Sequence, residues 1–317
     1  MSTFEELKIT GFDHLEFAVA DLDKSVELYL KLGFEKLGAR QSRERQLRSF
    51  LMGQNDLFIL LSQSSEPKDP VAQYVQKHGD GVISIAFRCE DATSAVDTAA
   101  RRGATVLQPP RSIEKDFGSV AQASIAAFGD VRHTFISRQG SLFAEGFDTP
   151  FAQDVRGNGL TGIDHVAISV ESDKQPEWKL FYEKIFGLVA QASMEETSPK
   201  TAAPWVMESA NQSIRLVLRK NVQDFLDVHH GPGVQHAALK SNSILETMEH
   251  LKTHEISFEP APNAYYEALP KRIHYFTENL EDLKRQEILV EGDSKGYLLH
   301  GYNNPLFGPF FYEIIER

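Results

Sequence analysis

Three residues in the second half of the sequence could together hold a divalent metal ion. His165 and His236 each lie in an apolar stretch, and Glu313 lies between aromatic and aliphatic residues in the segment Phe310–Ile315. A carboxylate in such apolar surroundings is costly unless it is paired or metal-bound. Two neutral imidazoles and one carboxylate form the ligand set of non-haem Fe(II), with positions left open for substrate and dioxygen. The sequence therefore predicts His165, His236 and Glu313 as iron ligands.

An internal repeat relates these positions to the first half of the chain. Thr-Gly-Phe-Asp-His ends at His14, and Thr-Gly-Ile-Asp-His ends at His165. A second pair of similar segments, Gly79–Phe87 and Gly231–Leu239, follows at nearly the same distance in each half. Each half therefore contains two similar units, and the chain contains four. Repeats of this length need neighbouring repeats to bury their apolar faces.

The first half serves as an internal comparison for the proposed ligand set. His14 lies opposite His165, and Ser84 lies opposite His236. Aligning Gly140–Glu145 with the segment that ends at Glu313 places Glu145 opposite the third ligand. A neutral serine is a poor ligand for a divalent transition metal. We therefore expect the second half to hold the metal and the first half to have a structural role.

The elements that position these residues follow from hydrophobic periodicity. Each unit opens with an alternating stretch typical of a half-buried strand, continues as a helix and leaves room for three more strands. This order predicts an α+β fold of curved sheets in two domains, with one strand, one helix and about three more strands in each of the four units. We expect these domains at residues 1–152 and 153–317, joined by the polar linker Thr149–Gly159. The expected helices are Asp23–Leu32, Thr93–Arg102, Gln175–Phe186 and Ser243–His254.

Other histidines and aromatic residues have simpler interpretations. A single histidine on a strand is usually a hydrogen-bonded core or surface residue, and His14 keeps that interpretation. His229 and His230 precede a Gly-Pro-Gly turn and are expected in a solvated loop. The aromatic cluster Phe307–Phe311 is expected in the core rather than as a platform for a substrate.

Composition excludes several classes of protein. The chain has 317 residues, a formal net charge of −12 and 41% hydrophobic residues, which suits a globular protein of two domains. The acidic balance argues against a general nucleic-acid-binding protein, and no apolar run is long enough to cross a membrane. The single cysteine, Cys89, and a start without a signal peptide favour a cytoplasmic location. A small molecule is the expected partner, and a second copy of the chain is a candidate.

Longer motifs carry a family resemblance over nearly the whole chain. They are His78–Val82, Gly129–Phe135, Gly231–Leu239, Tyr265–Arg272 and Pro305–Arg317. Together they resemble the 4-hydroxyphenylpyruvate dioxygenases of the vicinal-oxygen-chelate superfamily, whose fold is glyoxalase-like. The resemblance implies four βαβββ modules that form two open β-barrel domains. It also implies that the same three residues hold Fe(II), in the open barrel of the second domain.

The resemblance also implies a reaction. A 2-oxo acid binds the iron, dioxygen attacks its keto carbon, carbon dioxide leaves, and the rest of the same molecule is oxidised. In the named family the product of 4-hydroxyphenylpyruvate is homogentisate. Sister enzymes hydroxylate the benzylic carbon instead and form 4-hydroxymandelate. Iron supplies the redox step, while the protein sets the geometry and excludes water.

Several substrate-binding positions depart from the family pattern. A glutamine before the second ligand is retained, and other family pocket positions are occupied by different residues. The resulting candidates for substrate contact are Gln235, Pro204 with its neighbour Trp205, Asn221, His300, Tyr302 and Phe311. The family also continues past its glutamate ligand into a helix that closes the pocket, whereas this sequence stops at Arg317. A partner chain, the loop Asn263–Pro270 or the long segment Met194–Trp205 could supply that cover.

Three alternatives to a 4-hydroxyphenylpyruvate dioxygenase follow from these departures. The chain could resemble hydroxymandelate synthase, or it could oxidise a different 2-oxo acid. It could keep the metal and act as a ring-cleaving enzyme or an isomerase on the same scaffold. It could also be a binding protein that retains the fold without catalysis.

Overall fold

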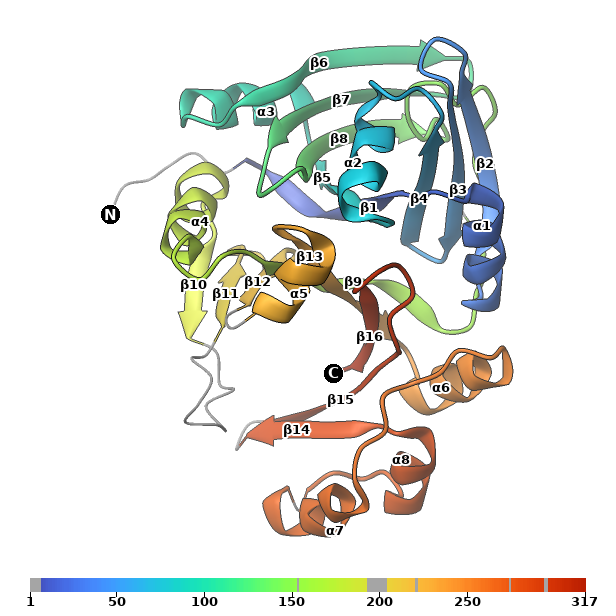
Figure 1. The fold of residues 1–317 in the computed structure, drawn as a ribbon, viewed down its shortest axis with the longest axis vertical. Coiled ribbons are helices and arrows are strands. Elements are labelled where there is room, and N and C mark those ends of the chain that lie inside the picture. The colour runs from blue at the N-terminus through green and yellow to red at the C-terminus, as the bar shows by residue number, and fades with distance from the viewer. Residues whose placement is uncertain (1–6, 153, 193–203, 220–221, 274, 294–295) are drawn as a thin grey trace.

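Two eight-stranded sheets form the protein (Figure 1). The computed structural model describes residues 7–317 except 153, 193–203, 220–221, 274 and 294–295. The strands of the first sheet are β1 (Ile9–Ala18), β2 (Glu35–Ser42), β3 (Leu47–Gln54), β4 (Leu57–Ser64), β5 (Gly81–Cys89), β6 (Val106–Lys115), β7 (Gly118–Ala126) and β8 (Arg132–Gly140). The strands of the second sheet are β9 (Leu160–Ser169), β10 (Val189–Ala192), β11 (Trp205–Glu208), β12 (Arg215–Arg219), β13 (Gly233–Ser241), β14 (Leu289–Asp293), β15 (Gly296–Tyr302) and β16 (Phe311–Glu316).

The order of the strands confirms four βαβββ modules. The first sheet runs β2-β3-β4-β1-β5-β8-β7-β6, and the second runs β10-β11-β12-β9-β13-β16-β15-β14. In each module the opening strand pairs in parallel with the last strand, as β1 does with β4 and β13 does with β16. The opening strands of two modules pair antiparallel at the centre of each sheet. The expected domain boundary after residue 152 lies between β8 and β9.

The helices that follow the four opening strands lie close to their predicted positions. They are α1 (Leu22–Lys31), α3 (Ala92–Arg101), α4 (Gln175–Phe181) with the π-helical turn η1 (Tyr182–Phe186), and α6 (Ile244–Thr253). The remaining helices are α2 (Pro70–His78), α5 (Gln223–His229), α7 (Asn263–Arg272) and α8 (Leu280–Gln286). The segment Asn263–Pro270, expected as a loop, is therefore helical. None of the helices in the described residues is long and apolar enough to span a membrane.

One continuous apolar core joins the two sheets. It contains buried residues of both halves, such as Phe17 on β1 and Ile314 on β16. Two tyrosines meet across the halves, where the hydroxyls of Tyr29 on α1 and Tyr312 on β16 lie 2.6 Å apart. Side chains alternate along each strand, so the residues next to these core residues point to the other face of the sheet. That inner face carries the polar residues that the repeat selects.

Irregularities in the strand pairing adjust which residues reach the inner face. The register between β13 and β9 shifts at Gln235 and again at Asp164. The register between β1 and β5 shifts at the matching positions, Ile83 and Asp13. A β-bulge of this kind inserts one extra residue and re-aims the side chain beside it. The bulge before each opening histidine allows it to contact the aspartate that precedes it in the sequence.

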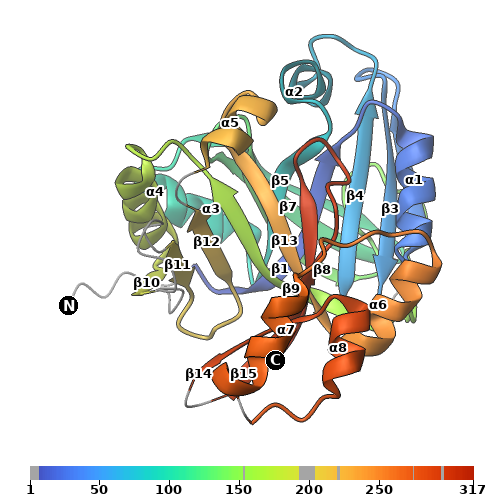
Figure 2. The same ribbon diagram turned by 60° about the horizontal axis from the view of Figure 1, so that its bottom comes forward.

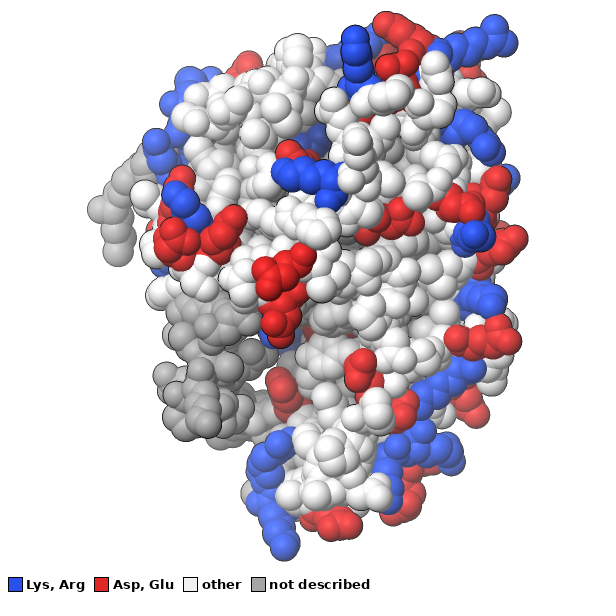
Figure 3. Space-filling model, viewed as in Figure 1, with Lys and Arg blue, Asp and Glu red and all other residues white. Residues whose placement is uncertain are grey.

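Acidic and basic side chains are mixed on the described surface of the face shown in Figure 3. On the face shown in Figure 3, acidic and basic residues alternate around the edge of the molecule. Many of the described charges form ion pairs, such as Lys31 with Glu255 and Arg88 with Asp56.

Candidate metal centre

Three neighbouring strands bring the predicted ligands together. His165 on β9 pairs across the strands with Ala238 on β13, and Ala238 pairs on its other side with Glu313 on β16. His236 lies two residues before Ala238 and therefore shares the same face of the sheet. Figure 2 shows β9, β13 and β16 side by side in the second sheet. One ligand atom of each of the three residues lies within 4.8 Å of the others.

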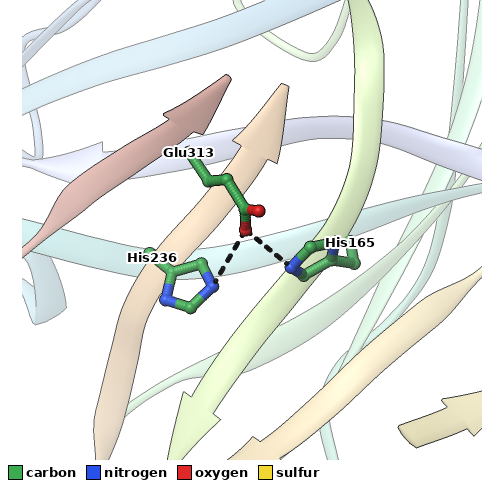
Figure 4. A group of neighbouring side chains, drawn as sticks. All are labelled: His165, His236 and Glu313. Atoms are coloured by element: carbon green, nitrogen blue, oxygen red, sulfur yellow. Dashed lines mark ion pairs between the residues drawn. The ribbon is translucent and has the colours of Figure 1, made fainter. Parts of the chain in front are cut away.

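The geometry of the three side chains suits a metal ion. Figure 4 shows the carboxylate of Glu313 pointing between the two imidazoles. Its Oε2 lies 3.2 Å from Nε2 of His165 and 3.6 Å from Nε2 of His236. All three residues are buried, so the group is shielded from water. The structure therefore brings these residues together, and their assignment as ligands remains a prediction.

The protonation preferences of the three residues fit a bound cation. Burial lowers the pKa of His236 to about 3, which keeps this imidazole neutral with a lone pair available. Burial opposes the charge on Glu313, but hydrogen bonds from His165 and His300 hold its pKa well below the ordinary range. Burial also opposes a charge on His165, yet Asp164 and Glu313 raise its pKa. The site therefore favours positive charge between its carboxylates, which a divalent metal supplies.

A chain of hydrogen bonds fixes the orientation of His165. Its Nδ1 lies 3.0 Å from Oδ1 of Asp164, which leaves Nε2 directed at Glu313. Arg317 donates to both oxygens of Asp164, and Arg215 donates to Oδ1 at 3.1 Å. Such a carboxylate behind a histidine sets the ring orientation in metal sites. Although burial would raise the pKa of Asp164, its bonds to His165 and Arg317 hold it well below the usual range.

His300 occupies the far side of Glu313. Its Nδ1 donates a hydrogen bond of 2.9 Å to Oε1, the oxygen that does not face His165 and His236. His300 is buried, and its Nε2 has no hydrogen-bond partner in the described part of the chain. His300, predicted as a substrate contact, therefore contacts the proposed ligand Glu313 and is not among the residues that line the cavity described below.

A cavity of about 370 Å³ opens beside His236. Phe311 forms one wall and stacks on the imidazole of His236, with ring centroids 4.9 Å apart. Tyr302 also lines the cavity and lies edge-on to His300 at 5.2 Å. The complete lining consists of Arg219, His236, Glu259, Tyr302, Asn303, Pro305 and Phe311. The predicted contacts Tyr302 and Phe311 are thus at the cavity. Phe311 was also expected in the core, but it is only half-buried.

The other predicted contacts lie elsewhere or outside the described residues. Gln235 is the bulged residue before His236, and its Oε1 is buried without a described hydrogen-bond partner. Pro204 and Trp205 are half-buried at the start of β11, and neither lines the cavity. Asn221 lies outside the residues that the structure describes, and so does most of the candidate cover Met194–Trp205.

Sequence reasoning did not identify Arg219, Glu259 and Asn303. These residues end strands or lie in connections, where the sequence offers no periodicity that places a side chain. The only available signal was the position of Arg219 at the end of an apolar strand.

The strand register corrects one predicted equivalence between the halves. In the second sheet Ala238 pairs with Glu313, and in the first sheet Ala86 pairs with Thr134. Ala86 and Ala238 are themselves equivalent, since each also pairs with the histidine of its opening strand. Thr134 is therefore the counterpart of Glu313, and the prediction of Glu145 was wrong. Glu145 lies in a turn and pairs with an arginine of β6.

The first half keeps the supporting residues of the site without its other two ligands. His14 lies 2.6 Å from Asp13, which Arg138 contacts through two hydrogen bonds. The remaining positions are Ser84 and Thr134, whose hydroxyls lie 2.8 Å apart. Two neutral hydroxyls and one imidazole are a weak ligand set for a transition metal.

Similar proteins give a consistent identification of the fold and family. The model described as hydroxyphenylpyruvate dioxygenase, N-terminal, matches residues 5–144, and that of the glyoxalase/bleomycin resistance protein/dioxygenase superfamily matches residues 162–278. The 4-hydroxyphenylpyruvate dioxygenase of Tetrahymena thermophila is 30% identical over 98% of this chain and 85% of its own. The protein of the same name from Dictyostelium discoideum is 29% identical, over 97% and 92% of the two chains.

Solved structures agree with these relatives. A mutant of 4-hydroxymandelate synthase from Streptomyces coelicolor superposes with a TM-score of 0.85 at 27% identity, covering 98% of this chain and 93% of its own. A fusion of a xylose isomerase-like TIM barrel with 4-hydroxyphenylpyruvate dioxygenase has a TM-score of 0.80 at 25% identity, over 100% of this chain and 50% of that one. An Mn(II)-bound glyoxalase from Novosphingobium aromaticivorans, with a TM-score of 0.56 at 12% identity, shares the fold.

Proposed function

Because the chain belongs to the 4-hydroxyphenylpyruvate dioxygenase family, we propose that it is an Fe(II)-dependent dioxygenase. Its substrate is a 2-oxo acid, which it decarboxylates oxidatively and hydroxylates in the same molecule. The observation that carries this proposal is the buried group of His165, His236 and Glu313 beside a cavity of about 370 Å³. Ligand pockets of this class have volumes of about 300–1,000 Å³, so an aryl 2-oxo acid fits.

The residues of the chain have distinct tasks in this reaction. His165, His236 and Glu313 would hold Fe(II), which when bound supplies the redox chemistry that activates dioxygen. Asp164 keeps the Nε2 of His165 directed at the metal position, and His300 keeps one oxygen of Glu313 engaged. These bonds reduce the freedom of the ligands before substrate arrives, which lowers the cost of assembling the site.

The walls of the cavity orient the substrate and exclude water. Phe311 and Tyr302 present aromatic faces beside His236, where they can contact an aryl group. Both rings also limit the access of water to the metal position, which protects reactive oxygen chemistry from side reactions. The overall reaction balances as one 2-oxo acid and one dioxygen giving one carbon dioxide and one hydroxylated acid that is one carbon shorter.

Oxygen consumption tests the proposal directly. Protein loaded anaerobically with Fe(II) is mixed with 4-hydroxyphenylpyruvate, and oxygen uptake, carbon dioxide release and product mass are measured. We expect equal amounts of oxygen consumed and carbon dioxide released. Replacement of His165, His236 or Glu313 by alanine should abolish turnover while the protein stays folded. Full activity in any of these variants, or no turnover with every aryl and alkyl pyruvate tried, contradicts the proposal.

A second candidate is the formation of 4-hydroxymandelate from the same substrate. The structural similarity to 4-hydroxymandelate synthase favours it, since the TM-score is 0.85 over 98% of this chain. Both reactions use the same ligands and differ in which carbon is hydroxylated. The mass spectrum alone does not separate the ring-hydroxylated product from the benzylic one, so chromatography against both standards decides between them.

A further inference from the structure

The wall of the cavity beside His236 contains an arginine without an ion-pair partner among the described residues. Arg219 is the last residue of β12 and is half-buried in the cavity wall. Its backbone oxygen accepts a hydrogen bond from the side chain of Gln175. Its guanidinium has no hydrogen bond or ion pair within the described residues. Since an arginine stays protonated in proteins, this side chain brings a full charge and several donors to the cavity.

A second donor lines the same cavity without a partner. The Nδ2 group of Asn303 is buried and has no hydrogen-bond partner among the described residues. The orientation of this amide is fixed, because its Oδ1 accepts a hydrogen bond of 2.6 Å from the backbone nitrogen of Tyr312. Buried polar groups are almost always satisfied in folded proteins, so an orphaned donor at a ligand cavity calls for an acceptor.

Glu259, the other charged residue of the cavity wall, does not remove the preference of Arg219 and Asn303 for a negatively charged acceptor. Glu259 also lines the cavity, but it is exposed to solvent. No ion pair joins Glu259 to Arg219 in the described part of the chain. Water and salt screen an exposed carboxylate much more than a half-buried guanidinium. The half-buried part of the wall therefore selects for hydrogen-bond acceptors with negative charge.

We propose that Arg219 and Asn303 recognise a second carboxylate of the substrate, distinct from its 2-oxo acid group. The substrate class is therefore a 2-oxo acid that carries a second carboxylate. This inference rests on the proposed function, in which the 2-oxo acid group binds at the metal. Charge-assisted hydrogen bonds to a guanidinium are about twice as strong as neutral ones, so this contact discriminates between substrates.

Two matched probes test the inference through binding. 4-Carboxyphenylpyruvate and 4-carbamoylphenylpyruvate have nearly the same shape, and only the first carries the second negative charge. Each is titrated by calorimetry into Fe(II)-loaded protein without oxygen, with phenylpyruvate as a reference. We expect the carboxylate probe to bind at least about tenfold more tightly than the amide, as one charge-assisted hydrogen bond allows.

Variants assign this preference to the two residues. Arg219→Gln should reduce the preference to less than about threefold, and Arg219→Lys should restore part of it, because lysine keeps the charge without the fork of donors. Asn303→Asp keeps the acceptor for Tyr312 but replaces the donor, and it should also reduce the preference. Glu259→Gln should leave the preference unchanged or increase it. Arg285→Gln, on α8 and ion-paired with Asp282, is the control for loss of an arginine.

The outcomes separate this inference from the proposed function. Equal binding of the two probes to the wild-type protein overturns the inference alone, since 2-oxo acids still bind. An Arg219→Gln variant that weakens all three compounds equally also overturns it, because Arg219 then contacts the shared 2-oxo acid group. If none of the three compounds binds, the inference is overturned, and oxygen uptake with other 2-oxo acids decides the proposed function separately. Thermal unfolding of each variant establishes that it is folded.

Discussion

Glu313 has a different neighbour on each oxygen of its carboxylate. Oε2 faces the two imidazoles at 3.2 and 3.6 Å, and Oε1 accepts a hydrogen bond from His300. This arrangement leaves one oxygen for a metal and fixes the rotation of the carboxylate about its last bond. A residue that holds a ligand in this way acts as a positioning residue. We therefore expect metal binding to depend on His300 as well as on the three ligands.

Replacing His300 should weaken metal binding. Residues that support metal ligands typically change affinity by about 10–100-fold when they are removed, so His300→Ala should raise the dissociation constant for Co(II) by at least about tenfold. Its visible absorption spectrum should also change, because the carboxylate is free to rotate. A Co(II) titration followed by absorption measures both effects.

Two further variants make the His300 experiment specific. His300→Gln keeps a donor for Glu313 and should restore the Co(II) spectrum. His254→Ala removes an exposed histidine at the end of α6 and should change neither affinity nor spectrum. An unchanged spectrum in His300→Ala would show that its hydrogen bond to Glu313 does not position the carboxylate.

At the scale of elements, buried ion pairs join strands that are distant in sequence. Glu16 on β1 contacts Arg40 on β2 and Arg132 on β8, and it accepts a hydrogen bond from Ser62 on β4. Burial alone would raise the pKa of Glu16, but the two arginines lower it from 4.5 to about 2. The ionised carboxylate therefore holds four strands of the first sheet together.

The stability of the protein should depend on the ionisation of Glu16. A carboxylate with a lowered folded-state pKa stabilises the fold above its unfolded pKa of 4.5, and this contribution is lost as the pH falls towards 2. Between pH 5 and pH 3 the linkage amounts to about 2 kcal/mol in the free energy of unfolding. Urea unfolding at both pH values measures it.

Glu16→Gln isolates this contribution, because glutamine does not titrate. The variant should be less stable than the wild type at pH 5, since Arg40 and Arg132 lose their partner. Between pH 5 and pH 3, the free energy of unfolding of the variant should change by about 2 kcal/mol less than that of the wild type. An equal pH dependence in both proteins would assign the acid sensitivity to other carboxylates.

The sequence predicts regular elements well and irregular ones poorly. The helix expected at Thr93–Arg102 is observed at Ala92–Arg101, because its apolar spacing is regular. Asn263–Pro270 was expected as a loop but lies in the helix α7, whose Pro270 is in the last turn, where fewer hydrogen bonds are lost. The bulge at Asp164 was equally unpredictable, although it sets the direction of His165.

Tertiary contacts account for the remaining errors. His229 was expected in a solvated loop, but it is buried and stacks on His78 of the other half at 4.4 Å. Only the packing of α5 against α2 determines this burial. The equivalence of Glu145 was wrong because local similarity of short segments does not fix the register of strands. The two histidines of the predicted metal site, in contrast, were found from the repeat, and Glu313 was found from its apolar surroundings.

For the whole molecule, the two halves share one scaffold but differ in the residues at the ligand positions. Both halves have a β-bulge, an aspartate and an arginine that support the histidine of the opening strand. The second half adds an imidazole and a carboxylate, whereas the first half has Ser84 and Thr134. The family membership and the enzymatic character of its relatives agree with the prediction from sequence. One metal ion per chain is the consequence that the repeat predicts.

Metal stoichiometry tests the interpretation of the two halves. Equilibrium dialysis against Co(II) should give one tightly bound ion per wild-type chain, and His14→Ala should not change this number. The double variant Ser84→His with Thr134→Glu completes a second ligand set on the frame of Asp13 and Arg138, and it should bind two ions. Two tightly bound ions in the wild type would contradict a structural role for the first half.

The fate of the two oxygen atoms of dioxygen tests whether the protein decarboxylates and hydroxylates the same molecule. The Fe(II)-loaded protein is supplied with isotopically labelled dioxygen and the 2-oxo acid that supports the fastest oxygen uptake, and the product is analysed by mass spectrometry. We expect both labelled atoms to enter the same product molecule, one in its new carboxylate and one in its hydroxyl group. A product with no label, or with label in only one position under conditions where water does not exchange, would contradict it.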